Sequence, residues 1–172
     1  SFISIVLFLV IDFFLGKKIH NFFVVDSPAI KHEVFYQNLK PNYRKEHTFI
    51  GNYLLCTDKN GFKSSCDTKK ITKRFDVAFI GDSFTEGVGL TYKESFVGLF
   101  AERYNNLEIV NLGVHRYAPT IYFKKLEYFF NQGYRFDRII IFIDVGDIYE
   151  ENFYEIVDQK VIKNNYPSIL FN

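Results

Sequence analysis

The chain has 172 residues, of which 48% are hydrophobic, and this is enough for one domain with a buried core. The formal net charge is +1, because 21 lysines and arginines are interspersed with 20 acidic residues. No basic stripe is present in the sequence, so a nucleic-acid-binding function is not indicated.

The N-terminal stretch SFISIVLFLVIDFFL is apolar except for Ser1, Ser4 and Asp12. A membrane-spanning helix needs about 20 apolar residues. We therefore interpret residues 1–16 as part of a transmembrane or signal-anchor helix, which residues upstream of Ser1 would complete. The alternatives are a buried core helix and the hydrophobic centre of a signal peptide. The adjacent Lys17-Lys18 pair favours a cytoplasmic location for the C-terminal side of the helix, but the charge comparison also requires the residues before Ser1.

Residues 17–74 are expected to form a connector with some local structure. Within it, Cys56 and Cys66 flank TDKNGFKSS, whose Asn60-Gly61 pair is a strong turn signal. A hairpin here would bring the sulfurs together, and a disulfide would suit an oxidising compartment. The alternative is two free thiols. Two cysteines without a neighbouring histidine make a poor metal site, and we expect neither a metal nor another cofactor. An anchor and a disulfide together predict a single-pass membrane protein whose domain faces the periplasm or the exterior.

From residue 75 onward, short apolar runs alternate with helical patterns. The predicted order is strand 75–80, helix 92–104, strand 107–112, helix 119–131 and strand 138–143, with Gly133 positioned to end the second helix. This alternation is typical of an α/β fold with a parallel sheet between two helical layers. The strand at residues 75–80 ends at Gly81-Asp82-Ser83, and the next two end near Gly113 and at residues 144–147. Because ligands bind at the carboxyl ends of parallel strands, we expect the functional site there.

The stretch FIGDSFTEGVG resembles the first motif of the SGNH/GDSL hydrolases, with Phe84 in place of Leu. NLGV at residues 111–114 resembles the second motif. IDVGDIYEE at residues 143–151 occupies the place of the third, which in the family reads Gly-x-Asn-Asp. The resemblance covers residues 75–151 and is strongest to membrane-tethered bacterial members that act on acylated sugars. It implies a three-layer, flavodoxin-like α/β/α fold, of which residues 75–172 would be the N-terminal part.

The resemblance also implies roles for individual residues. Ser83 would be the nucleophile and would donate its own N–H to an oxyanion, and Gly113 would donate a second N–H. Gly146 stands where the family has the oxyanion asparagine, so its N–H would replace that donor. Asp147 would organise the third loop, and Asp82 would organise the turn at the serine.

The general base of the family lies in a C-terminal Asp-x-x-His motif, and no histidine follows His115 in this chain. We expect the chain to be truncated before that motif. His20, His32 and His47 are expected at the surface. His115 follows Gly113 on the functional rim, where the alternatives are a contact with substrate, simple exposure in the loop and a contact with Ser83.

The expected function is therefore that of a serine esterase acting on O-acetylated envelope carbohydrate. The alternatives are an O-acyltransferase on surface polysaccharide and a non-catalytic envelope-anchored domain of the same fold. The chain itself is expected to show little or no esterase activity.

Overall fold

The computed structural model describes residues 28–47, 51–67 and 72–164, so the expected N-terminal anchor at residues 1–16 lies outside the described residues. Within the described part, no helix is long and apolar enough to cross a membrane. The strands are β1 (Ala29–His32), β2 (Tyr36–Leu39), β3 (Arg44–His47), β4 (Tyr53–Cys56), β5 (Arg74–Ile80), β6 (Ile109–Asn111), β7 (Arg135–Ile141), β8 (Tyr154–Val157) and β9 (Lys160–Lys163). The helices are α2 (Ser83–Glu86), α3 (Phe96–Arg103), α4 (Pro119–Asn131) and α5 (Val145–Glu150), with a 3₁₀ turn at Glu151–Phe153.

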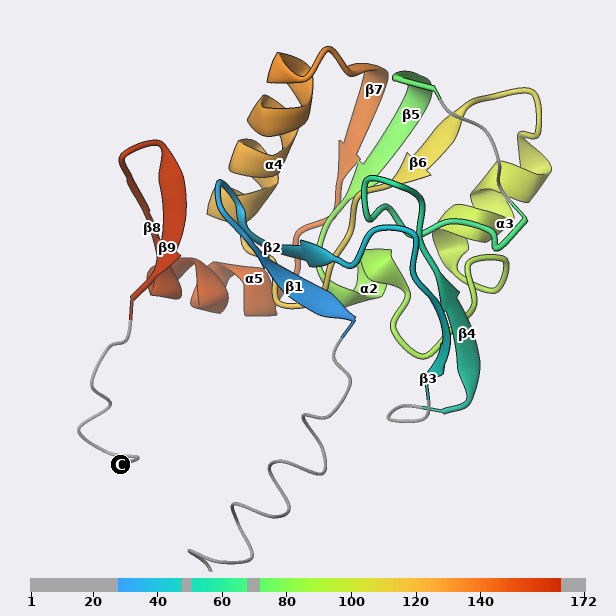
Figure 1. Ribbon diagram of the computed structural model, residues 1–172, viewed down its shortest axis with the longest axis horizontal. Coiled ribbons are helices and arrows are strands. Elements are labelled where there is room, and N and C mark those ends of the chain that lie inside the picture. The colour runs from blue at the N-terminus through green and yellow to red at the C-terminus, as the bar shows by residue number, and fades with distance from the viewer. Residues whose placement is uncertain (1–27, 48–50, 68–71, 165–172) are drawn as a thin grey trace, which may run out of the picture.

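A parallel three-stranded sheet in the order β6-β5-β7 lies at the centre, so the predicted α/β class with a parallel sheet is confirmed. Apolar side chains alternate along β5. Ala78 and Ile80 join the larger core under α4, whereas Val77 and Phe79 form a smaller core with Val97 of α3. The two helices therefore cover opposite faces of the sheet (Figure 1).

Helix α4 has the predicted bounds because both of its ends carry strong local signals. Pro119 occupies the first turn, where its missing N–H costs nothing. At the other end Gly133 has φ of +83°, and the N–H of Tyr134 donates to the carbonyl of Phe129 at 3.0 Å. This is the left-handed ending that glycine allows.

The other predicted elements differ from the structure at their ends. Strand β5 begins one residue earlier than predicted, and β6 spans Ile109–Asn111 instead of residues 107–112. Helix α3 begins at Phe96 rather than at residue 92, because the hydroxyl of Ser95 caps it by accepting from the N–H of Gly98 at 3.2 Å. Strand β7 begins at Arg135, three residues before the predicted start, because Arg135 and Phe136 pair with the first residues of β5. An apolar pattern misses this start, since Arg135 and Asp137 are polar.

The described part of the expected connector belongs to the main core. Hairpin β1–β2 supplies Leu39, and the adjacent turn supplies Phe35, both fully buried against the α4 side. Phe62, between the two cysteines, is 1% exposed in the same cluster. Cys56 and Cys66 form a disulfide, which was one of the two interpretations of the sequence.

Candidate active site

The carboxyl ends of β5 and β7 meet at one rim of the sheet, where α2 and α5 begin (Figure 1). The chain passes from β5 to β6 on one side and then to β7 on the other, so the order of the sheet reverses between β5 and β7. Open α/β sheets bind ligands at this kind of switch point. The candidate site lies there.

Ser83 is the first residue of α2, a helix of one turn. Its side chain is partly exposed, and its hydroxyl donates to Oδ2 of Asp82 at 3.1 Å. Oδ1 of Asp82 accepts from the N–H of Phe84 at 3.0 Å, so Asp82 is the N-cap of the helix. The N–H of Ser83 occupies a helix position that has no intrahelical acceptor, which leaves it suited to an anionic oxygen.

Glycine is required at the exit from β5. A Cβ on Gly81 would lie 2.2 Å from Oγ1 of Thr85 and 2.9 Å from the carbonyl oxygen of Phe142. The hydroxyl of Thr85 is buried and has no hydrogen-bond partner among the residues that the structure describes. Because Gly81 has no side chain, α2 packs closely against the residues that follow β7, and Ser83 therefore lies at the rim.

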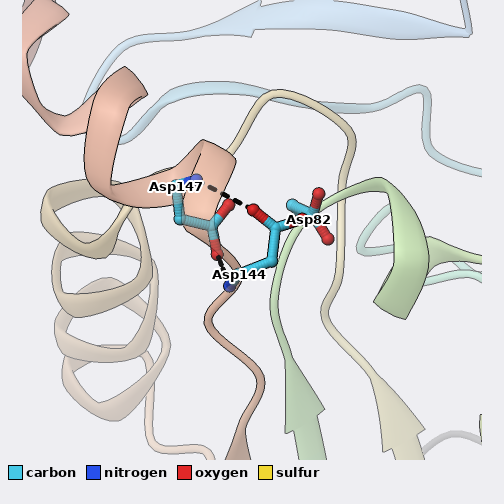
Figure 2. Close-up of side chains that lie close together, drawn as sticks. All are labelled: Asp82, Asp144 and Asp147. Atoms are coloured by element: carbon cyan, nitrogen blue, oxygen red, sulfur yellow. Dashed lines mark hydrogen bonds between the residues drawn. The ribbon is translucent and has the colours of Figure 1, made fainter.

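Three carboxylates surround this rim: Asp82, Asp144 and Asp147 have oxygens within 4.8 Å of one another (Figure 2). Asp144 is the N-cap of α5, and its Oδ1 accepts from the N–H of Asp147 at 3.0 Å. In the reciprocal bond of this capping box, Oδ2 of Asp147 accepts from the N–H of Asp144 at 3.0 Å. Such a set could offer oxygen ligands to a divalent cation. The hydrogen bonds, however, already explain the three carboxylates as caps of two helices.

Asp147 is 2% exposed and also accepts from the hydroxyl of Tyr122 at 2.7 Å. Burial raises its pKa above the usual range, and the neighbouring carboxylates add to the effect. Burial also raises the pKa of the Tyr122 hydroxyl, which the bond to Asp147 reinforces. Asp147 therefore anchors α5 to α4, in keeping with an organising role for the third loop.

The expected role of Gly113 as an oxyanion donor does not match its surroundings. Its N–H is buried and donates to Oδ1 of Asn111 at 2.9 Å, an i to i+2 turn that asparagine favours. The same asparagine donates to the carbonyl oxygen of Thr85 at 2.7 Å. A Cβ on Gly113 would lie 2.6 Å from the backbone nitrogen of Glu86, so this glycine allows β6 and α2 to pack closely.

Glu86, which lies in the first motif but was assigned no role there, connects α2 to the loop after β6. Its side chain is 1% exposed, and Oε2 accepts from the backbone N–H of His115 at 2.6 Å. Oε2 also lies 2.9 Å from Nδ1 of the same histidine. Among the described residues, the hydroxyl of Ser83 donates to Asp82 and to no histidine.

The remaining expected residues are Gly146 and the three histidines that precede His115. Gly146 is exposed in the first turn of α5, one residue before Asp147. His32, expected at the surface, is partly buried and stacks on Phe35 with ring centroids 3.5 Å apart. Burial lowers its pKa to about 4. His47 is partly buried beside Tyr53, and His20 lies outside the described residues.

Three buried lysines, Lys63, Lys124 and Lys125, were also missed by sequence reasoning. Nζ of Lys125 donates to the carbonyl oxygen of Leu112, to Asn38 and to Tyr117. Nζ of Lys63 donates to two carbonyls just beyond α2. A lysine carries no sequence signal for burial, since lysines are almost always exposed.

Comparison with protein-family models, with curated proteins and with solved structures found no match to this chain. The assignment of a function consequently depends on the motifs and on the geometry of the rim.

Proposed function

We propose that this chain is a serine esterase of the SGNH/GDSL type, with Ser83 as the nucleophile. The observation that carries the proposal is the position of Ser83, partly exposed at the start of a helix that follows the central strand. The strand order β6-β5-β7 agrees with the first three strands of a flavodoxin-like sheet, which has the order 2-1-3 at this edge. The third motif supports the same reading, because its aspartates lie beside Asp82.

The chemistry would proceed through an acyl-enzyme. Oγ of Ser83 attacks the ester carbonyl carbon and transfers its proton to a base, and the bond between that carbon and the alcohol oxygen then breaks. The alcohol takes up the proton and leaves. Water next attacks the acyl-serine, which releases the acid and returns a proton to Ser83. If a sugar hydroxyl attacks instead of water, the product is a new ester, and the protein is an O-acyltransferase.

The oxyanion that forms in each step would have two candidate donors, the N–H of Ser83 and the N–H of Gly146. The side-chain amide that the family uses is absent at Gly146, and the N–H of Gly113 is held by Asn111. Losing one oxyanion donor costs about 2.7–4 kcal/mol, or roughly a hundred- to a thousandfold in rate. Slow turnover is therefore expected from the residues present.

The proposed substrate is an acyl ester of cell-envelope carbohydrate. The disulfide supports an oxidising compartment, and the apolar residues 1–16 support an anchor in the membrane. Resemblance to the family favours an O-acetyl group on the carbohydrate.

A second candidate, a non-catalytic domain of the same fold, is favoured by two specific contacts. The N–H of Gly113 is already bonded, and Nδ1 of His115 is held by Glu86 instead of facing Ser83 as a base. Such a domain would bind its glycan without cleaving an ester.

Labelling with a fluorophosphonate probe distinguishes the two candidates. The probe forms a bond between phosphorus and a nucleophilic serine Oγ, with loss of fluoride and a proton. We expect one probe per chain at Ser83, detected by mass spectrometry, and none in Ser83→Ala. Equal labelling of wild type and Ser83→Ala, or no labelling of either, would contradict the esterase. Hydrolysis of p-nitrophenyl acetate by the chain is expected to be slow, and rapid hydrolysis that Ser83→Ala abolishes would refute this expectation.

A further inference from the structure

Helix α2, which begins with Ser83, is too short to be stable without contacts from other segments. Helix α2 has only four residues, and isolated helices need about 12–15 residues to be even marginally stable in water. Its position therefore depends on the contacts that other segments make with it. Two of these contacts come from β6 and the loop after it. The side chain of Asn111 donates to the carbonyl oxygen of Thr85, and the backbone N–H of His115 donates to the carboxylate of Glu86.

The third contact comes from a distant part of the sequence. Nζ of Lys63 donates to the carbonyl oxygen of Gly87 at 2.7 Å and to that of Leu90 at 2.7 Å. Gly87 is the C-cap of α2, with φ of 72°. The carbonyls at the C-terminal end of a helix carry partial negative charge, so an ammonium group is stabilised there. Lys63 is thus placed at the far end of the short helix that begins with Ser83.

Lys63 is 1% exposed, which is rare for a lysine. Its ammonium group lies 5.3 Å from the centroid of the Tyr53 ring, a cation–π distance. Burial lowers the pKa of Lys63 to about 8, while the charge of Glu86 acts in the opposite direction. Burying a lysine ammonium group costs free energy, and the two hydrogen bonds offset this cost. The contact of Lys63 with α2 is therefore specific.

The disulfide loop holds the backbone of Lys63 in place. The loop closed by Cys56 and Cys66 contains an isolated bridge between Thr57 and Lys63. A second bridge joins Lys63 to Asn111, at the end of β6. Lys63 and Asn111 therefore form one unit, whose side chains hold carbonyls at the C-terminal end of α2.

We propose that Lys63 is a positioning residue for Ser83. It holds α2 in place through its hydrogen bonds beyond the C-terminal end of the helix, and the loop closed by the Cys56–Cys66 disulfide fixes the position of Lys63. The disulfide then helps to hold the candidate site in place, and its reduction increases the mobility of α2, which begins with Ser83. This inference rests on the proposed function for its effect on chemistry, but the contact itself can be tested without any reaction.

Amide hydrogen exchange of the full chain tests the contact. In Lys63→Met we expect exchange at residues 82–90 to rise at least about tenfold, while residues 119–131 of α4 keep the wild-type rate. Lys63→Arg should restore part of the protection, because a guanidinium can also donate to both carbonyls. Lys59→Met is the matched control, since Lys59 belongs to the same loop and is exposed. Unchanged exchange at residues 82–90 would overturn the proposal. A rise that also includes α4 would overturn it too, because Lys63 would then act on global stability.

Fluorophosphonate labelling tests the consequence for Ser83. We expect labelling of Lys63→Met to be roughly ten- to a hundredfold slower than wild type, as for a displacement of a reacting group by about 1 Å. Lys59→Met should label at the wild-type rate. An unchanged rate in Lys63→Met would overturn the positioning role. If wild-type Ser83 is not labelled at all, the proposed function fails, and the exchange experiment still decides the role of Lys63.

Reduction of the wild-type protein provides a second test that needs no substitution. Dithiothreitol supplies the two electrons and two protons that convert the disulfide into two thiols. We expect faster exchange at residues 82–90 and slower labelling of Ser83, with α4 unaffected. If reduced and oxidised protein behave alike at residues 82–90, the link between the loop and the site is refuted.

Discussion

The carboxylate of Glu86 accepts two hydrogen bonds from a single residue, one from the backbone N–H and one from the ring of His115, at 2.6 and 2.9 Å. The carboxylate is 1% exposed. Burial lowers the pKa values of Lys63 and Lys125, and the negative charge of Glu86 opposes this lowering in both. The carboxylate is therefore the negative centre of a buried polar network beneath the rim. Neutralising it would leave two buried ammonium groups less compensated.

Substitution Glu86→Gln should lower the free energy of unfolding by about 2–4 kcal/mol, as expected for the loss of a buried, charge-assisted interaction. Denaturant unfolding at neutral pH measures the change. The matched control is Asp137→Asn, which breaks the exposed ion pair with Arg74 at 3.2 Å and should cost less than about 1 kcal/mol. Equal losses in the two variants would show that the network contributes no more than a surface pair.

Gly113→Ala should destabilise the protein by about 2–3 kcal/mol, because the new Cβ would meet backbone atoms of Thr85 and Glu86 at 2.8 and 2.6 Å. The displacement of α2 should also slow fluorophosphonate labelling of Ser83. Gly133→Ala is the control, since its Cβ would meet no atom of the described chain within 4 Å and its φ of +83° would cost only about 1 kcal/mol. The explanation is wrong if both variants label at the wild-type rate.

Stability should rise with pH above neutrality because of Lys125. Burial lowers its pKa to about 7 in the folded protein, against a usual value of 10.5. Between these two pH values the unfolded chain binds a proton that the folded chain has released, so the free energy of unfolding increases with pH, by at most about 1.4 kcal/mol per pH unit. Lys63 adds a smaller effect of the same sign above pH 8. Below pH 7 both states bind the proton, and Lys125 contributes no slope.

Urea unfolding at pH 6, 7.5 and 9 measures this dependence. Lys125→Met should flatten the profile, whereas Lys59→Met, at an exposed position, should leave it unchanged. A wild-type profile that is already flat above pH 7, or a Lys125→Met profile as steep as wild type, would contradict the argument.

Local signals in the sequence were sufficient to predict the sheet and α4. The strand around Ala78 contains a continuous apolar run, the strand around Val110 is short and begins with two apolar residues, and α4 has proline at its start and glycine just beyond its end. The rim results from these elements, because parallel strands end on the same side. For this reason the position of Ser83 at the start of a helix was predictable.

The contacts that hold α2 could not be predicted in the same way. Lys63 lies in a polar stretch and Lys125 lies in the amphipathic helix α4, and the burial of both depends on how distant segments pack. The bond from Gly113 to Asn111 depends on a side-chain rotamer, and it removes a donor that the motif had suggested. The expected connector lacked long apolar runs, yet single residues such as Phe35 and Phe62 bring it into the core.

The open edge of β7 leads to the last prediction. Strand β7 pairs only with β5 among the described strands. Ile141 at its end is 50% exposed, and Phe142 and Ile143, which follow the strand, are 44% and 57% exposed. An exposed apolar edge strand is a template for pairing with another chain. The chain should therefore be marginally stable and should self-associate as its concentration rises.

A charge at this edge should suppress the association. Ile143→Lys places a lysine at the most exposed of the three positions and should keep the chain monomeric at concentrations where wild type forms larger species, as measured by sedimentation velocity. Ile139→Lys is the contrasting variant, because Ile139 packs against the main core and the charge there should unfold the protein instead. A wild-type chain that stays monomeric and melts cooperatively at the same concentrations would show that the edge is protected.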